Sequence, residues 1–112
     1  LPHLMGFQDN LTTLPPADGL ARIELDGPGG VAGVIENRPG SQGSLRIYRY
    51  LALKYGAIDA AAAAEGLALY AEHTQDARAH PGKHPNIDRL LALQAGSPQL
   101  EVRLIPAPTA SG

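Results

Sequence analysis

The sequence predicts an α+β fold in which a small three-stranded antiparallel sheet is covered by three to four helices, in the order α-β-β-α-α-α-β. Two stretches that alternate apolar and polar residues flank a glycine-rich turn, which is typical of a β-hairpin. Apolar residues recur at helical spacing in three later stretches, and a last alternating stretch predicts a third strand. This order of elements favours helices gathered on one face of a sheet.

The N-terminal part of the chain supplies a short helix and the hairpin. Residues 6–14 favour a helix or turn that ends before Pro15, since proline cannot continue a helix. Residues 21–26 alternate apolar with charged side chains and predict a strand with one buried face. The turn at 26–30 then leads into a second β-like run at 31–36.

Two helices are predicted next, each with a marked end. The first covers residues 45–55, with Ser44 as its N-cap and Gly56 as the residue that closes it. Asp59 is suited to cap the second helix, which we expect to run without a break through the alanine-rich segment to Ala77.

A proline-bounded bend separates the second helix from the last two elements. Pro81 ends the helix, because the residue before a proline is pushed out of helical space, and residues 81–85 form the bend. We expect Asn86 to cap a third helix over residues 87–94. Alternation at residues 100–104 predicts the last strand.

Composition excludes several classes of function. Nine Lys and Arg against eleven Asp and Glu leave a net charge of −2, so we expect no nucleic-acid partner. The chain has no cysteine, which excludes disulfides and thiolate metal sites and favours a cytoplasmic location. No apolar run approaches the roughly 20 residues of a membrane span, so we expect a soluble protein without a membrane partner.

The chain has the size of one domain. Residues 1–4 precede the only methionine, Met5, and we expect them to be a remnant of cloning. Residues 5–106 are expected to form a single globular domain, because 112 residues suffice for one hydrophobic core. The Pro- and Ala-rich residues 107–112 are expected to be a flexible tail.

Three segments carry a family resemblance: GFQDNL, ENRPGSQGSLRIY and EGLALYAEHTQDARAHPGKHPNIDRLL. Through them the chain, from about Gly6 to Leu93, resembles a family of small bacterial proteins catalogued only as a domain of unknown function. The resemblance implies a bacterial, cytoplasmic origin and brings no activity, substrate or catalytic residue with it.

The first candidate site is the loop before the first long helix, with Arg38, Gly40, Ser41, Gly43 and Ser44. Two glycines and two serines ahead of a helix N-terminus can cradle a phosphate or carboxylate, with arginine adding positive charge. The P-loop pattern is absent. The same residues would also serve as a plain strand-to-helix connection, so both interpretations stay open.

The second candidate site is the histidine-rich segment with His73, Asp76, His80 and His84. On a continuing helix, His73, Asp76 and His80 would share one face, and two imidazoles with a carboxylate suit zinc or iron. Metalloenzyme spacings such as HExxH are absent. A solvated helix end followed by a tight turn explains the same residues, because helix C-termini favour basic side chains.

Lys83 and His84 lie just ahead of the third helix, where free amides and the helix dipole favour anions. If this segment and the glycine-rich loop faced one cleft, Arg38, Lys83 and His84 would form a cationic rim around a carboxylate such as Asp76. Such a cleft would suit a phosphorylated or carboxylate metabolite.

Two classes of function follow from these observations. The first is a non-enzymatic module that binds a protein or an anionic small molecule, with a homodimer expected because a short sheet leaves open edges. The alternative is a metal-dependent or acid–base enzyme that uses the histidine-rich segment.

Overall fold

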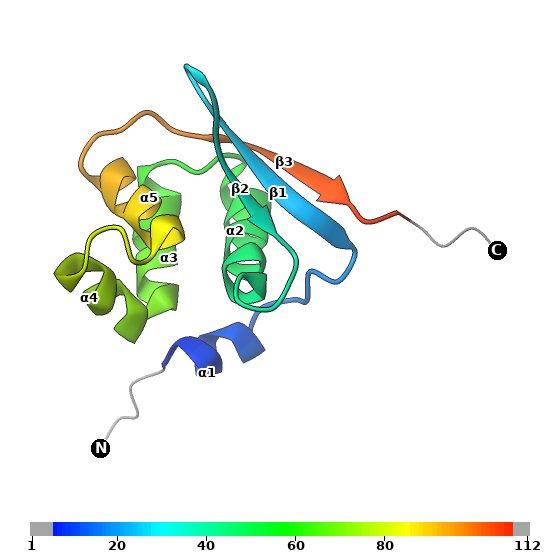
Figure 1. Ribbon diagram of the computed structural model, residues 1–112, viewed down its shortest axis with the longest axis horizontal. Helices are drawn as coiled ribbons and strands as arrows, with labels where there is room; N and C mark the ends of the chain where they lie inside the picture. The colour runs from blue at the N-terminus through cyan, green and yellow to red at the C-terminus, as the bar shows by residue number, and fades with distance from the viewer. Residues whose placement is uncertain (1–5, 109–112) are drawn as a thin grey trace.

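The computed structural model describes residues 6–108, so the predicted cloning remnant and the end of the predicted tail lie outside the described residues. The described chain contains three strands and five helices (Figure 1). In chain order these are α1 (Phe7–Thr12), β1 (Leu20–Gly27), β2 (Gly30–Glu36), α2 (Gln42–Tyr55), α3 (Ala60–Tyr70), α4 (Glu72–Ala79), α5 (Pro85–Gln94) and β3 (Glu101–Pro106).

The sheet is antiparallel throughout, in the order β2-β1-β3, with the predicted hairpin forming β1 and β2. Ile23 of β1 lies opposite Ile35 of β2 and Leu104 of β3, so apolar side chains align on one face. Glu24, one residue on, pairs with Val34 and Arg103 on the other face. The period of two in the sequence therefore corresponds to one buried and one open face.

A single hydrophobic core lies between the sheet and the helices. Ile23, Leu25 and Ile35 of the sheet are buried, and α2 packs against both β1 and β2. Helix α3 lies against α2 and α5. Gly66 makes this approach possible, because a Cβ there would lie 2.7 Å from Leu90 Cδ1 and 2.9 Å from Leu51 Cδ1. The predicted α+β fold class is confirmed.

Two helix caps match the predictions from the sequence. Asp59 Oδ1 accepts a hydrogen bond from the amide of Ala62 at 2.8 Å, as an N-cap does. Gly56 has φ 83° at the end of α2, a left-handed conformation that glycine adopts without steric cost.

Two helix starts differ from the predictions. Helix α2 begins at Gln42 with Ser41 in the N-cap position, so Ser44 lies inside the first turn. Helix α5 begins at Pro85, with His84 in the N-cap position, so Asn86 is helical rather than capping. Proline at the first helical position has a suitable φ and lacks only an amide that would be unpaired there. The helix therefore starts two residues earlier than an Asn86 cap implies.

The long second helix is interrupted at Ala71, which separates α3 from α4 and adds one helix to the predicted order. Ala71 has φ 53° and ψ −119°, outside helical space. The Thr74 hydroxyl donates to the carbonyl of Leu67 at 2.6 Å and so satisfies an acceptor that the break leaves at the end of α3. The expectation of a continuous helix to Ala77 is therefore wrong, and α4 has its own direction.

Candidate functional site

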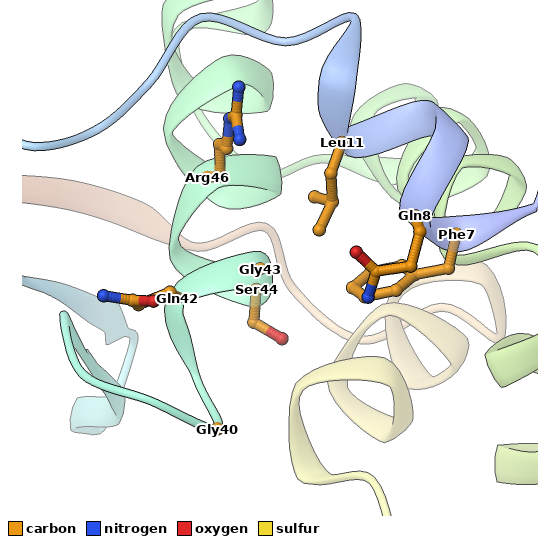
Figure 2. A pocket seen from close by; sticks show the side chains of 8 residues that line it. All are labelled: Phe7, Gln8, Leu11, Gly40, Gln42, Gly43, Ser44 and Arg46. Carbon is orange, nitrogen blue, oxygen red and sulfur yellow. The ribbon is translucent and has the colours of Figure 1, made fainter.

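Two adjoining hollows lie where the start of α2 faces α1 and the loop before α5. The first has a volume of about 370 Å³, and Figure 2 shows Phe7, Gln8 and Leu11 of α1 pointing across it toward α2. The second has a volume of about 300 Å³ and extends to the loop before α5. Both are lined by Phe7, Gly40 and Ser44, so together they form one trough, called here the α2 trough.

The start of α2 presents free amide groups to the α2 trough. The amides of Ser41 and Gln42 both donate to the carbonyl of Arg38, which closes the preceding turn. The amides of Gly43 and Ser44 have no hydrogen-bond partner in the described part of the chain. Both residues line the trough, so these donors and the positive end of the helix dipole are available to a ligand.

Phe7 packs directly on the backbone of α2. A Cβ on Gly43 would lie 2.7 Å from Phe7 Cζ, so the absence of a side chain allows this contact. The Phe7 ring stacks on Tyr70 with centroids 5.7 Å apart, and its other neighbour is His73, edge-on at 4.7 Å. Aromatic rings from α1, α3 and α4 therefore form one wall of the trough.

Helix α1 is held in place by hydrogen bonds to the region of the break between α3 and α4. The amide of Phe7 donates to Glu72 Oε1 at 2.8 Å, and this bond lowers the pKa of the Glu72 carboxyl. The Asn10 side chain donates to the carbonyl of Leu69 at 2.9 Å. The break at Ala71 thus brings Glu72 to the N-terminus of α1, where a carboxylate is stabilised by the helix dipole.

Ser44 is oriented by a buried tyrosine. The Tyr70 hydroxyl donates to Ser44 Oγ at 2.6 Å, and burial raises the pKa of Tyr70, which keeps that phenol a donor. Because Ser44 Oγ accepts this bond, its own proton is free to donate elsewhere. The serine thus adds a hydroxyl donor beside the free amides.

Asp76 of α4 joins two basic side chains at the far wall of the trough. Its Oδ2 lies 2.6 Å from His84 Nε2 and 3.0 Å from Lys83 Nζ. His80 Nε2 lies further out, 3.8 Å from Oδ1. The hydrogen bonds to His84 and then to Lys83 lower the pKa of Asp76 to about 2. The carboxylate therefore stays charged and ties the 81–85 bend to α4.

A family model described as "Uncharacterized protein conserved in bacteria (DUF2322)" matches residues 7–104. The chain belongs to this family. The resemblance predicted from the sequence is thereby confirmed. No curated protein and no solved structure matches the chain. No helix of the described residues is long and apolar enough to cross a membrane. The cytoplasmic location and the domain limits stay predictions.

In this family member the two predicted anion-binding segments meet at the α2 trough. Gly40, Gly43 and Ser44 line it from one side, and Lys83 and His84 line it from the other. The remaining two predicted residues lie elsewhere. Arg38 is exposed and lines neither hollow, and Ser41 Oγ donates to the carbonyl of Glu36 at 2.5 Å.

Of the predicted metal ligands, His84 lies beside both His73 and Asp76, while Asp76 and His80 line neither hollow. The rings of His73 and His84 have centroids 5.9 Å apart, and both line the trough. Among residues 6–108 no group of three His, Asp or Glu side chains is arranged to hold a metal ion. Lys83 occupies one side of the Asp76 carboxylate instead.

Among the residues of the trough that sequence reasoning missed are Phe7, Tyr70 and Asn86. Phe7 is the only phenylalanine of the chain, and in the structure it is half-buried and packs against the edge of the core. Tyr70 is buried in the core, and nothing in its sequence neighbourhood pointed to Ser44. Asn86 was interpreted as a cap.

Proposed function

We propose that the protein is a non-enzymatic module that binds a small molecule carrying a phosphate or carboxylate group. The observation that supports this most is the meeting of two separate pre-helical segments, Gly40–Ser44 and Lys83–His84, at one trough. Each segment alone would be an ordinary helix start. Together they direct the N-termini of α2 and α5 to one place.

The donors around the trough suit an anion. The free amides of Gly43 and Ser44, the Ser44 hydroxyl and the Lys83 ammonium are all hydrogen-bond donors. Amides at a helix N-terminus bind anions because the helix dipole adds to the individual hydrogen bonds. The aromatic wall of Phe7 and Tyr70 would contact the apolar part of such a ligand.

Asp76 limits how strongly the trough attracts anions. Its carboxylate already pairs with Lys83 and His84, so an incoming anion competes with it for the same cations. The side chain of Lys83 is 58% exposed, which leaves it free to turn toward a ligand. The amides and the hydroxyl therefore supply the fixed part of the site, and Lys83 supplies an adjustable part.

Thermal unfolding with inorganic phosphate, against chloride of equal ionic strength, tests this proposal. At a concentration about tenfold above the dissociation constant, phosphate should stabilise the wild-type protein by about 1.4 kcal/mol, a shift of several degrees in melting temperature. In Lys83→Ala and Ser44→Ala the dissociation constant should rise about tenfold, because a charge-assisted hydrogen bond or a hydroxyl donor is lost.

Arg38→Ala is the matched control, since it removes a positive charge from the same region without touching the lining of the trough. Its phosphate shift should equal that of the wild-type protein. An Arg38→Ala variant that loses the shift while Lys83→Ala keeps it would contradict the proposed site. No shift in the wild-type protein with phosphate, citrate or another anion would contradict the function itself.

A metal-dependent or acid–base enzyme is a second candidate, favoured by the contact between Asp76 and His84. A carboxylate 2.6 Å from an imidazole orients the ring in the manner of general bases, and His84 of this pair lines the trough. In the metal-dependent form of this second candidate function, His73, Asp76, His80 and His84 would hold zinc or iron. Elemental analysis distinguishes the two: stoichiometric metal that is lost in His73→Ala would favour the enzyme.

A further inference from the structure

Asn86 lies in the first turn of α5 and lines the second hollow of the α2 trough. Both of its acceptor oxygens are already used within the protein. Its backbone carbonyl accepts a hydrogen bond from the buried Tyr48 hydroxyl at 2.5 Å, and its side-chain Oδ1 accepts one from Arg89 Nη1 at 2.9 Å. The NH2 group of the same side chain has no hydrogen-bond partner among residues 6–108. This donor is therefore left for a ligand.

Arg89 determines which way the Asn86 amide is turned. A guanidinium group can only donate hydrogen bonds, so the amide must direct its oxygen toward Arg89 and its NH2 group away from it. Arg89 is itself held by packing, since a Cβ on Gly33 of β2 would lie 2.4 Å from its Nη2. Its guanidinium carbon also lies 5.7 Å from the centre of the Tyr48 ring of α2. The free donor of Asn86 is thus fixed by the packing of α5 against β2 and α2.

The residues beside Asn86 in the second hollow also present donors. Ser44 Oγ accepts the hydrogen bond from Tyr70, which leaves its own proton to donate. The carbonyl of His84 already accepts two amide hydrogen bonds from the first turn of α5. Lys83 carries donors only, and the Asp76 carboxylate lines neither hollow. Free donors beside acceptors that are already paired favour a group rich in acceptors, such as an oxyanion.

The two hollows have separate sets of donors. Gly43 lines the first hollow, Asn86 lines the second, and Ser44 lines both. Since a water molecule takes up about 30 Å³ in the liquid, hollows of about 370 and 300 Å³ each have room for a group of several heavy atoms. A single anionic group on the amide of Gly43 would therefore leave the donor of Asn86 unused.

We propose that the α2 trough binds a ligand with two adjacent anionic groups, of the diphosphate class. One group lies on the amides of Gly43 and Ser44, and the other lies on the side-chain amide of Asn86. Arg89 is a positioning residue, because it turns the Asn86 donor toward the second group. This inference rests on the proposed function and adds to it the class of ligand and a residue that selects that class.

Isothermal titration calorimetry with inorganic phosphate and with pyrophosphate, in the absence of divalent metal ions, tests this proposal. The wild-type protein should bind pyrophosphate at least about tenfold more tightly than phosphate, because a second set of charge-assisted hydrogen bonds forms. In Asn86→Ala the dissociation constant of pyrophosphate should rise about tenfold, since a donor to a charged group is lost, while that of phosphate should change less than about twofold.

Asn86→Asp keeps the oxygen that Arg89 contacts and replaces the NH2 donor by a carboxylate oxygen, so it tests the donor with the local contacts retained. It should weaken pyrophosphate binding at least as much as Asn86→Ala. Gln94→Glu is the matched control, because it adds the same charge to α5 at a residue that lines neither hollow. This variant should keep the wild-type ratio of the two dissociation constants.

Arg89→Met tests the positioning role, since methionine retains a long side chain beside Gly33 but cannot donate to Asn86. The preference for pyrophosphate should fall while the dissociation constant of phosphate stays the same, a result that general destabilisation would not produce. An unchanged preference in this variant would overturn the role of Arg89.

The failure of this inference differs from that of the proposed function. If phosphate bound and pyrophosphate bound no more tightly, or if Asn86→Asp kept the wild-type preference, the diphosphate class would be wrong and the anion-binding function would stand. If neither anion bound to the wild-type protein, the proposed function would be wrong as well.

Discussion

At the residue scale, Asp76 pairs with two basic side chains that line the trough. It holds Lys83 and His84 of the bend and so fixes that segment against α4. All three side chains are partly exposed, and exposed ion pairs contribute little each, but here two share one carboxylate. The contribution depends on Asp76 being ionised, which its pKa of about 2 ensures down to strongly acidic pH.

We expect Asp76→Asn to lower the melting temperature at neutral pH. The folded-state pKa of Asp76 lies below its ordinary value, so the stabilisation is fully present above about pH 4 and is lost as pH falls toward 2. The difference in melting temperature from the wild-type protein should therefore shrink over this interval. Thermal melts followed by circular dichroism at several pH values measure it.

Asp18→Asn is the matched control, since it neutralises an exposed carboxylate on the loop before β1. It should shift the melting temperature little at any pH. If the melting temperature of Asp76→Asn stayed below that of the wild-type protein by the same amount down to pH 2, the ion pairs of Asp76 would not stabilise the fold.

At the element scale, the break between α3 and α4 determines the shape of the site. Because the chain turns at Ala71, Glu72 reaches the amide of Phe7 and His73 reaches the Phe7 ring. The same turn directs Asp76 toward the bend before α5. Ala71 is the non-glycine residue with positive φ in the described chain, a conformation that costs an L-amino acid free energy.

We expect Ala71→Gly to stabilise the protein by about 1 kcal/mol, because glycine adopts positive φ without the steric cost of a Cβ. Ala68→Gly, an exposed position inside α3, is the control and should destabilise by about 1 kcal/mol through lost helix propensity. Urea denaturation measures both. If Ala71→Gly destabilised the protein as much as Ala68→Gly, residue 71 would be helical in solution.

At the scale of the whole molecule, two buried tyrosines join the core to the site. The Tyr48 hydroxyl donates to the carbonyl of Asn86 at 2.5 Å and accepts a bond from Arg89 at 3.2 Å, linking α2 to α5. Tyr70 links α3 to the start of α2 through Ser44. Burial raises the pKa of both phenols, that of Tyr48 to about 12.

We expect the free energy of unfolding to fall as pH rises from about 10 to about 12. The unfolded chain releases the Tyr48 proton near pH 10, whereas the folded protein holds it until about pH 12, so stability is full below pH 10 and is lost above it. A shift of this size corresponds to about 2–3 kcal/mol. Tyrosinate absorbance and urea denaturation at each pH measure the change.

Tyr48→Phe separates this effect from general alkaline denaturation. The variant should be less stable at neutral pH by about 1–2 kcal/mol, since the Asn86 carbonyl loses its donor, but its stability should fall less steeply above pH 10. If the free energy of unfolding fell equally steeply with pH in both proteins, Tyr48 would not control alkaline unfolding.

The parts of the fold that were predicted correctly depend on neighbours in the chain. Alternation in β1 and β2, the Asp59 cap and the left-handed Gly56 all result from interactions within a few residues. The starts of α2 and α5 were misplaced by three and two residues, because serine and asparagine caps resemble residues of a first turn in sequence. The break at Ala71 had no local signal, since alanine favours a continuous helix.

For the candidate site, too, local features could be predicted from the sequence and long-range contacts could not. Its glycine-rich loop and its Lys83–His84 segment were found from composition, since glycine, serine and lysine before a helix suit anions wherever they lie. Their meeting at one trough, and the wall made by Phe7 and Tyr70, come from residues more than 25 positions apart. The local pattern thus determined the elements and the donor chemistry. Only the packing of α1, α4 and α5 around α2 decided which donors face one another, because that packing depends on the whole core.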